Sequence, residues 1–260
     1  MTELADRSIV ALRAHHDELA KVVSELAPEA LHGPSGALEW TLAQVLSHLG
    51  SGAEITRATI SASIPGTAAA EADNQSIWDR WNAASRQEQA TWFVEHDEDL
   101  VAMLEALSPQ QRESMKVSLG FLPEPVSLDV ALGMRLNEVA AHAWDVLVGL
   151  DPEARMSEES AALLAEHFTG GLGFLLGFSG KADRLSQQAI VALDGYELVI
   201  DDAVRVVRGT SEGETARFSG PLESAIRLLS GRLEPQHTPA GVQVTGNVTL
   251  DELRQVFPGY

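Results

Sequence analysis

The chain has 260 residues and carries 18 basic side chains against 38 acidic ones, a formal net charge of −20 at pH 7. With 45% hydrophobic and 22% charged residues, the composition is typical of a globular protein rather than a disordered one. The absence of cysteine excludes disulfides, Cys-ligated zinc, iron–sulfur clusters and a cysteine nucleophile. The strong negative charge argues against binding to nucleic acid or to an anionic membrane, because both require clustered basic side chains.

Residues 1–13 mix charged and apolar side chains and lack the basic segment followed by an apolar segment that a signal peptide needs. No run of about 18 or more apolar residues occurs, so we expect no transmembrane helix. We therefore expect a cytoplasmic monomer or homodimer whose partners are small molecules.

The first helix is indicated by apolar residues that recur on one helical face between Leu12 and Leu26. A second helix begins after Thr41, because Thr41 and Gln44 have the spacing of a capping box. Trp40 and Val45 flank this cap as a hydrophobic staple. The second helix contains His48 on an apolar face and is predicted to end near residue 64, before a Pro-Gly pair.

A longer helical stretch follows an alanine-rich connection at residues 67–72 and is predicted to end at Ser108. It carries three of the five tryptophans, Trp78, Trp81 and Trp92. Core packing is the usual role of such residues, and the wall of a binding cleft is the alternative. Ser127 then begins a helix that ends near residue 149, and a further helix covers residues 157–168.

Glycine-rich residues 170–180 indicate a domain boundary near residues 170–185. Beyond it, short strands are predicted at 189–193, 197–200, 204–207 and 242–244, and helices at 221–229 and 250–256. The predicted fold class is α + (α+β): an all-α N-terminal domain over residues 1–170, and a small α+β domain over residues 185–260.

Glu138 and His142 are four residues apart, so both side chains project from one face of their helix. Most such pairs are solvated or form surface ion pairs. Here the same face holds Val130 and Met134, so we expect it to point inward, where a glutamate and a histidine need partners. Asp145 lies three residues after His142 and can accept a hydrogen bond from the ring, as residues behind a metal ligand often do.

His48 alone would be interpreted as a buried core histidine. Together with Glu138 and His142 it would complete a set of two histidines and one carboxylate, which is a catalytic zinc pattern with an open position. If no metal binds, the alternative is that Glu138 and His142 pair in a polar core.

Two segments of the sequence resemble the mycothiol-dependent maleylpyruvate isomerase family of actinobacteria. Residues 40–49 (WTLAQVLSHL) are similar to its Trp-Thr…His-Leu signature, and residues 135–145 (RLNEVAAHAWD) to its Arg-x-x-Glu-x-x-x-His-x-x-Asp segment. The C-terminal part, with residues 216–233 and a Gly-Asn pair at 246–247, more loosely resembles the small second domain of many members.

This resemblance implies a DinB-like antiparallel helical bundle in which His48, Glu138 and His142 bind a divalent metal, usually zinc. It also implies mycothiol as the thiol partner, which is consistent with a chain that has no thiol of its own. In the isomerase members an arginine of the second domain assists with the anionic substrate, and Arg232 is the best match here. The alternative for Arg232 is a residue that follows a helix capped by Gly231. Arg135 either orders Glu138 or faces an acidic neighbour.

The leading hypothesis is a metal-dependent, mycothiol-using enzyme that transfers sulfur to an electrophile, for example in detoxification. The net charge slightly favours this reaction, because a dicarboxylate substrate would be repelled unless local arginines outweighed the repulsion. One alternative is a cis–trans isomerase of the maleylpyruvate type. An alternative of another class is a non-catalytic metal-binding module.

Overall fold

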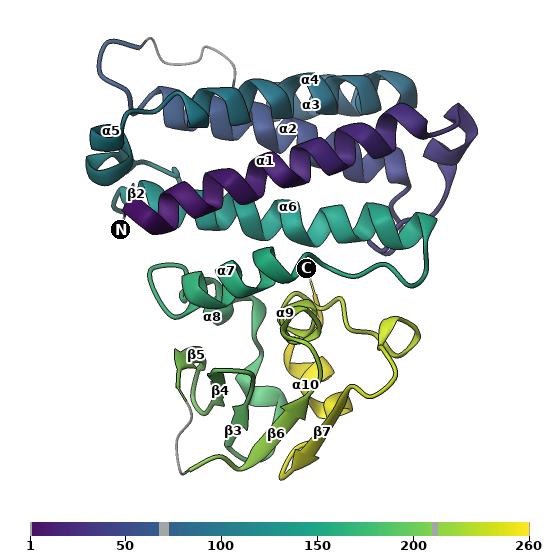
Figure 1. The fold of residues 1–260 in the computed structure, drawn as a ribbon, viewed down its shortest axis with the longest axis vertical. Coiled ribbons are helices and arrows are strands. Elements are labelled where there is room, and N and C mark those ends of the chain that lie inside the picture. Colours follow the sequence, from purple (N-terminus) through teal and green to yellow (C-terminus); the bar gives the residue numbers. More distant parts are fainter. Residues whose placement is uncertain (1, 68–72, 210–212, 260) are drawn as a thin grey trace. The chain divides into compact units, whose positions relative to one another are not determined.

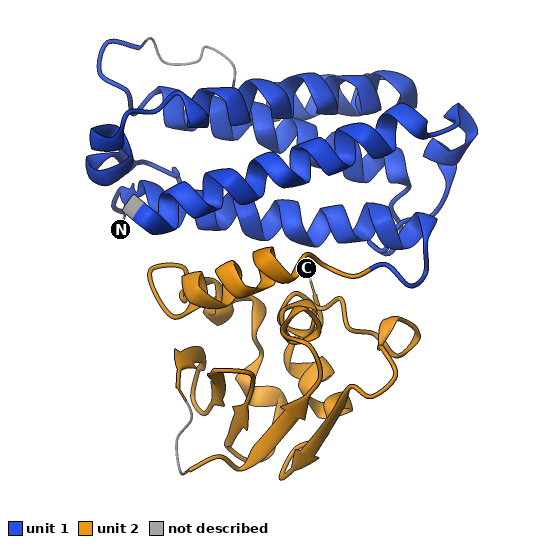
Figure 2. Ribbon diagram, in the orientation of Figure 1, with its two compact units in different colours: residues 1–154 blue, residues 155–260 orange. Residues whose placement is uncertain are grey.

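The computed structural model describes residues 2–67, 73–209 and 213–259, and divides into two compact units, Met1–Ala154 and Arg155–Tyr260 (Figure 2). Residues 68–72 of the predicted alanine-rich connection lie outside the described residues. Helix 158–168 is counted with the second unit, so the two units meet in the sequence at residues 154 and 155.

The first unit is built almost entirely from helices. Its elements are α1 (Thr2–Glu25), a 3₁₀ turn (Pro28–His32), α2 (Leu42–Ser61), α3 (Asn74–Ala83), α4 (Arg86–Glu105), α5 (Pro109–Ser114), β1 (Lys116–Val117), β2 (Val126–Ser127) and α6 (Leu128–Leu150). The two short strands pair antiparallel and were not predicted.

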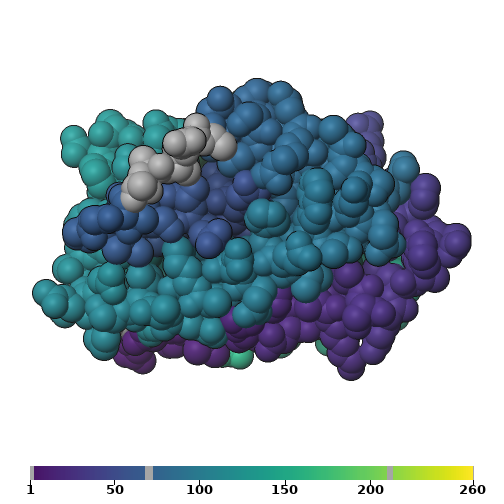
Figure 3. Space-filling view, turned by 90° about the horizontal axis from the view of Figure 1, so that it is seen from above, coloured from purple at the N-terminus to yellow at the C-terminus, as the bar shows by residue number. Residues whose placement is uncertain are grey.

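Helices α1, α2, α4 and α6 form a bundle in which α2 and α1 each pack against both α4 and α6 (Figure 1). Seen from the side of α3 and α4, the side chains of this unit close over the bundle, with α1 along one edge (Figure 3). Helices α2 and α6 are antiparallel: a Cβ on Gly149, near the end of α6, would meet Leu42 at the start of α2, whereas Arg135 reaches the Leu49 carbonyl. This pairing places the middle of α6 beside the second turn of α2.

The helix starts follow from local capping. The predicted capping box of α2 is confirmed. The Gln44 backbone nitrogen lies 3.3 Å from Thr41 Oγ1, and the Thr41 backbone nitrogen lies 2.8 Å from Gln44 Oε1. The helical stretch predicted up to Ser108 is divided into α3 and α4, because Ser85 and Glu88 form a second capping box within it. Ser127 stands at the start of α6, but its side chain makes no capping hydrogen bond.

The second unit combines helices with a small sheet. Its elements are α7 (Glu158–Phe168), α8 (Leu175–Ser179), a 3₁₀ turn (Ala182–Arg184), β3 (Ala189–Ala192), β4 (Tyr196–Ile200), β5 (Val204–Arg208), β6 (Ala216–Ser219), α9 (Leu222–Leu229), a 3₁₀ turn (Pro235–His237), β7 (Gln243–Gly246) and α10 (Leu250–Val256). The strands of the described sheet are ordered β5-β4-β3-β6-β7, with β3 and β6 parallel and the other neighbours antiparallel.

Helix α9 of this unit is buried along almost its whole length. Its Glu223 and Arg227 form an ion pair with Nε–Oε2 at 2.8 Å, and both side chains are fully buried. The same carboxylate lies 3.4 Å from the Met156 nitrogen, and Arg227 also donates to the His237 carbonyl. Buried charges of this kind are tolerated because every partner is hydrogen-bonded.

Among the described helices, none has the length and apolar character needed to span a membrane.

Candidate metal centre

His48, Glu138 and His142, the three predicted ligands, meet in the first unit. His48 lies two turns into α2, whose start the capping box fixes, and Glu138 and His142 lie one turn apart on α6. Because α2 and α6 are antiparallel neighbours, residues 90 or more positions apart come together. Each of the three offers one donor atom, and these atoms all lie within 4.8 Å of one another.

Glu138 lies between the two histidines. Its Oε2 is 3.2 Å from His48 Nε2 and 3.8 Å from His142 Nε2. The side chains of His48 and Glu138 are partly exposed, with 39% and 35% of their surface open to solvent, whereas His142 is buried. The cluster therefore has a closed side within the bundle and an open side toward solvent.

Asp145 determines how the His142 ring is oriented. His142 Nδ1 lies 2.7 Å from Asp145 Oδ2, and the Asp145 side chain is fully buried. A carboxylate that accepts a hydrogen bond from the Nδ1–H group leaves the lone pair on Nε2, the nitrogen that faces Glu138. The contact expected between Asp145 and the His142 ring is thus present.

The donor atoms fit a divalent metal. Zinc takes histidine nitrogens and carboxylate oxygens at about 2.0–2.2 Å, which puts tetrahedral ligand atoms roughly 3.4 Å apart. The two distances to Glu138 Oε2, 3.2 and 3.8 Å, lie a few tenths of an ångström from that value. Three protein ligands leave at least one coordination position for a small molecule.

Trp40 is part of this site, although the sequence suggested only a staple at the helix start. Its ring centroid lies 5.2 Å from that of His48 and 5.8 Å from that of His142, and it is nearly parallel to the His142 ring at 18°. The two histidine rings lie 4.6 Å apart. A tryptophan directly before the N-cap residue of the helix that carries His48 was the signal available in the sequence.

Residues 12–147 match the family described as the mycothiol maleylpyruvate isomerase N-terminal domain. The chain belongs to this family. The predicted family resemblance is therefore confirmed, and with it the expectation that the chain is an enzyme of the transferase or isomerase type.

Solved structures of related fold extend the similarity over both units of this family member. A crystal structure of a mycothiol-dependent maleylpyruvate isomerase matches with a TM-score of 0.60 at 15% identity, covering 94% of each chain. A variant of that enzyme with a histidine-to-alanine substitution matches with a TM-score of 0.58, again at 15% identity and 94% of each chain. The predicted DinB-like helical bundle with a small α+β region after it is confirmed. A comparison with curated proteins gave no match.

Arg135 of this family member lies one turn before Glu138 and connects α6 with α2 and α4 through hydrogen bonds. Its Nη2 donates to Asp97 Oδ1 of α4 at 2.8 Å and to the Leu49 carbonyl of α2 at 2.9 Å, and both charged side chains are buried. The acidic neighbour that the sequence allowed is thus Asp97. Asp97 Oδ2 also lies 3.1 Å from His16 Nδ1 of α1.

The ion pairs of Asp97 determine its charge state. Burial by itself would raise the pKa of Asp97, but the hydrogen bond from His16 and the positive charge of Arg135 outweigh it and hold the pKa below its ordinary value. Asp97 therefore stays ionised, as a buried partner of Arg135 must.

Arg232 lies in the second unit, directly after α9. Gly231 has a φ of +70°, its nitrogen bonds the Leu228 carbonyl at 3.0 Å, and the Arg232 nitrogen bonds the Arg227 carbonyl at 2.7 Å. These are the bonds of a Schellman cap, so the capping glycine of the alternative interpretation is present. The buried Arg232 guanidinium donates from Nη1 to the Ser230 carbonyl at 3.0 Å.

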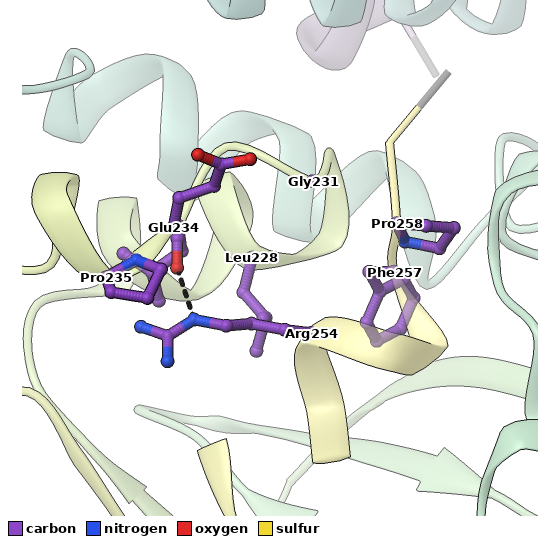
Figure 4. Close-up of a pocket in the computed structure, with 8 residues that line it drawn as sticks. Leu228, Gly231, Glu234, Pro235, Arg254, Phe257 and Pro258 are labelled. Carbon is purple, nitrogen blue, oxygen red and sulfur yellow. Dashed lines mark hydrogen bonds between the residues drawn. The ribbon is translucent and has the colours of Figure 1, made fainter. Parts of the chain in front are cut away.

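The second unit also contains a cavity of about 350 Å³ (Figure 4). Leu228, Leu233 and Phe257 supply apolar surface, and Arg254 donates from Nε to the Leu233 carbonyl at 2.7 Å. Arg232 is not among the residues that line this cavity, although the lining residues Gly231 and Leu233 flank it in sequence.

Proposed function

We propose that the chain is a metal-dependent enzyme that uses mycothiol to isomerise a conjugated, maleylpyruvate-like double bond. The observation that carries the proposal is the meeting of His48, Glu138 and His142 at an open position. The family membership supports the thiol and favours isomerisation over sulfur transfer.

The residues present have distinct tasks in this proposal. A free thiol has a pKa near 8.5. A divalent metal, which we propose to be zinc, would act as a Lewis acid and lower the pKa of a thiol bound to it. Asp145 holds His142 with Nε2 free to act as a ligand, and Glu138 lies between both histidines. Nickel, iron or manganese would accept the same nitrogen and oxygen donors.

The thiol must come from outside the chain, because the sequence contains no cysteine. A cytoplasmic location, where small thiols stay reduced, is part of the proposal. Reversible addition of a thiol to a conjugated double bond allows rotation about the carbon–carbon bond, and elimination then returns the thiol unchanged. Sulfur transfer instead keeps the new carbon–sulfur bond and consumes one thiol per turnover.

Sulfur transfer to an electrophile, as in detoxification, is the second candidate. The net charge of −20 favours it, because a dicarboxylate must overcome the repulsion of the whole molecule. For isomerisation we propose that Arg232 offsets this repulsion by binding a substrate carboxylate.

The test combines metal analysis with a thiol balance. Untagged protein is analysed for metal content, then incubated with mycothiol and a cis-configured conjugated keto acid, while product geometry and free thiol are both followed. Isomerisation predicts trans product at constant thiol, and sulfur transfer predicts one thiol lost per product. The proposal would be overturned if the protein were active without bound metal. It would also be overturned if the metal-bound protein showed no turnover that depends on the thiol.

Variants connect the result to the residues. Glu138→Gln and His48→Ala are expected to lose the metal and the activity together, whereas Glu113→Gln, an exposed glutamate on α5, retains both. Arg232→Met is expected to raise KM for an anionic substrate by roughly tenfold, as the loss of a charged hydrogen bond worth about 1.5 kcal/mol does. Equal metal content in His48→Ala and the wild type would contradict the ligand assignment.

A further inference from the structure

The loop over residues 35–40 is fixed to the helix that carries two of the ligands. The Gly36 nitrogen donates to the Asp145 carbonyl at 2.8 Å. A Cβ on Gly36 would come within 2.9 Å of Asp145 Oδ1 and 2.6 Å of Val148 Cγ1, so only glycine permits this approach. The loop therefore rests on the residue that orients His142.

The other end of the loop is fixed as well. Ser35 bonds the Trp40 carbonyl through its nitrogen at 3.2 Å and through its Oγ at 2.8 Å. Glu39 has a φ of +71°, the one positive value among the described residues other than glycine. Such a conformation persists only where the surrounding structure holds it, and it often accompanies a functional site.

The result of this loop geometry is the position of Trp40. With 37% of its surface exposed, Trp40 is not buried inside the bundle. Its ring contacts those of both His48 and His142, and thereby bridges ligands from two different helices. A tryptophan whose role was only to cap α2 would not need to touch a histidine on α6.

The charge of the histidine rings makes this contact sensitive to metal binding. An imidazole that donates its lone pair to a cation becomes more positive, and the face of an indole attracts positive charge. The contact between Trp40 and the histidines is therefore stronger with the metal bound than without it.

We propose that Trp40 is a positioning residue of the metal centre, whose indole ring orients His48 and His142 and raises the affinity for a divalent cation. This inference rests on the metal site of the proposed function. It adds a residue that supplies no ligand atom and acts through the two histidines.

The test uses Co²⁺ as the probe, because its visible absorption reports coordination geometry. The full-length protein is stripped with a chelator and titrated with Co²⁺, and Zn²⁺ affinity is obtained by competition. Trp40→Leu keeps an apolar side chain without an aromatic face, Trp40→Phe keeps an aromatic face, and Trp78→Leu serves as an exposed tryptophan control on α3. Circular dichroism verifies that each variant is folded.

We expect Trp40→Leu to bind Co²⁺ roughly tenfold more weakly than the wild type, within the range seen for residues behind metal ligands. Its Co²⁺ absorption bands shift, Trp40→Phe recovers most of the affinity, and Trp78→Leu is unchanged. Wild-type affinity and bands in Trp40→Leu would overturn the role of Trp40 while leaving the metal site intact. A wild-type protein that binds no Co²⁺ would instead overturn the proposed metal site, and this inference with it.

Discussion

A histidine that binds a cation through one ring nitrogen is more effective when the other nitrogen is hydrogen-bonded to a fixed acceptor. Asp145 supplies that acceptor for His142 at 2.7 Å and has no exposed surface. Its backbone carbonyl also accepts the bond from Gly36. One residue thus orients His142 and anchors the loop that carries Trp40.

Asp145→Asn removes the negative charge behind His142 and keeps the shape of the side chain. We expect a 10–100-fold loss of metal affinity, because the ring loses basicity and its preferred tautomer. Competition of each protein with a chromogenic chelator for Zn²⁺ measures the effect. Asp129→Asn, in the first turn of the same helix, is the matched control. An affinity loss of the same size in both variants would show that helix charge, rather than the contact with His142, is responsible.

Gly36→Ala tests the close approach of the loop to α6. The added Cβ would lie 2.6 Å from Val148 Cγ1 and 3.0 Å from Asp145 Cα, so the loop must move. We expect a loss of about 1–3 kcal/mol in the free energy of unfolding, as for other overpacked positions. Gly177→Ala on α8, where a Cβ would meet nothing within 4 Å, should change it by less than about 1 kcal/mol. Urea denaturation compares the two, and an equal effect would contradict the steric argument.

At the scale of elements, the bundle is held together near the site by buried charges. Arg135 connects α6 with Asp97 of α4 and with the α2 carbonyl that directly follows His48. Because Arg135 lies one turn before Glu138, this connection sets the spacing between α2 and α6 where His48 faces Glu138 and His142. Its effect on these three side chains is therefore geometric.

Arg135→Met leaves Asp97 buried with one partner fewer. We expect a loss of about 3–5 kcal/mol in the free energy of unfolding, the usual cost of an uncompensated buried charge. Combining Arg135→Met with Asp97→Leu should recover part of this loss, because the remaining charge is also removed. Denaturation of the two single variants and the double variant gives the coupling energy. Strictly additive losses would mean that the ion pair contributes nothing to stability.

Helices and strands can be predicted from the sequence when neighbouring residues determine where they begin and end. The start of α2 and the spacing of Glu138 and His142 are properties of a few neighbouring residues, and they were predicted. The capping box at Ser85 and Glu88 is also local, but the apolar pattern from Trp78 to residue 107 continues across it, so the break was missed.

Elements and contacts that depend on distant residues could not be predicted in this way. Strand β6 has only four residues, and its pairing with β3 is parallel, so its stability comes from strands elsewhere in the chain. Likewise, Trp40 is eight residues from His48 and 102 from His142, and no spacing rule places one ring against both.

At the scale of the whole molecule, the net charge of −20 makes stability sensitive to pH. Ion pairs such as that of Asp97 with Arg135 favour the folded state as long as the carboxyl group is ionised. Because the pKa of Asp97 is held below its ordinary value, its contribution is present above that ordinary value, near 4, and is lost as the pH falls further. The effect of pH in the mildly acidic range therefore comes from other groups.

His15 is such a group. Burial in α1 lowers its pKa from 6.5 to about 4. Between these two pH values the unfolded chain binds a proton on His15 that the folded chain does not. The free energy of unfolding therefore falls as the pH decreases through this window, by up to about 3 kcal/mol from this residue. Glu18, whose pKa burial raises, opposes part of the change.

His15→Gln removes this titration, so its stability should depend less on pH between 6.5 and 4 than that of the wild type. Urea denaturation at several pH values across this window measures both slopes. The difference between the slopes isolates His15 from His48, Glu138 and His142, which both proteins retain. His32→Gln, at an exposed position, should keep the wild-type slope. If His15→Gln retained that slope as well, His15 would have to be protonated in the folded chain, and the acid sensitivity would originate at another buried group.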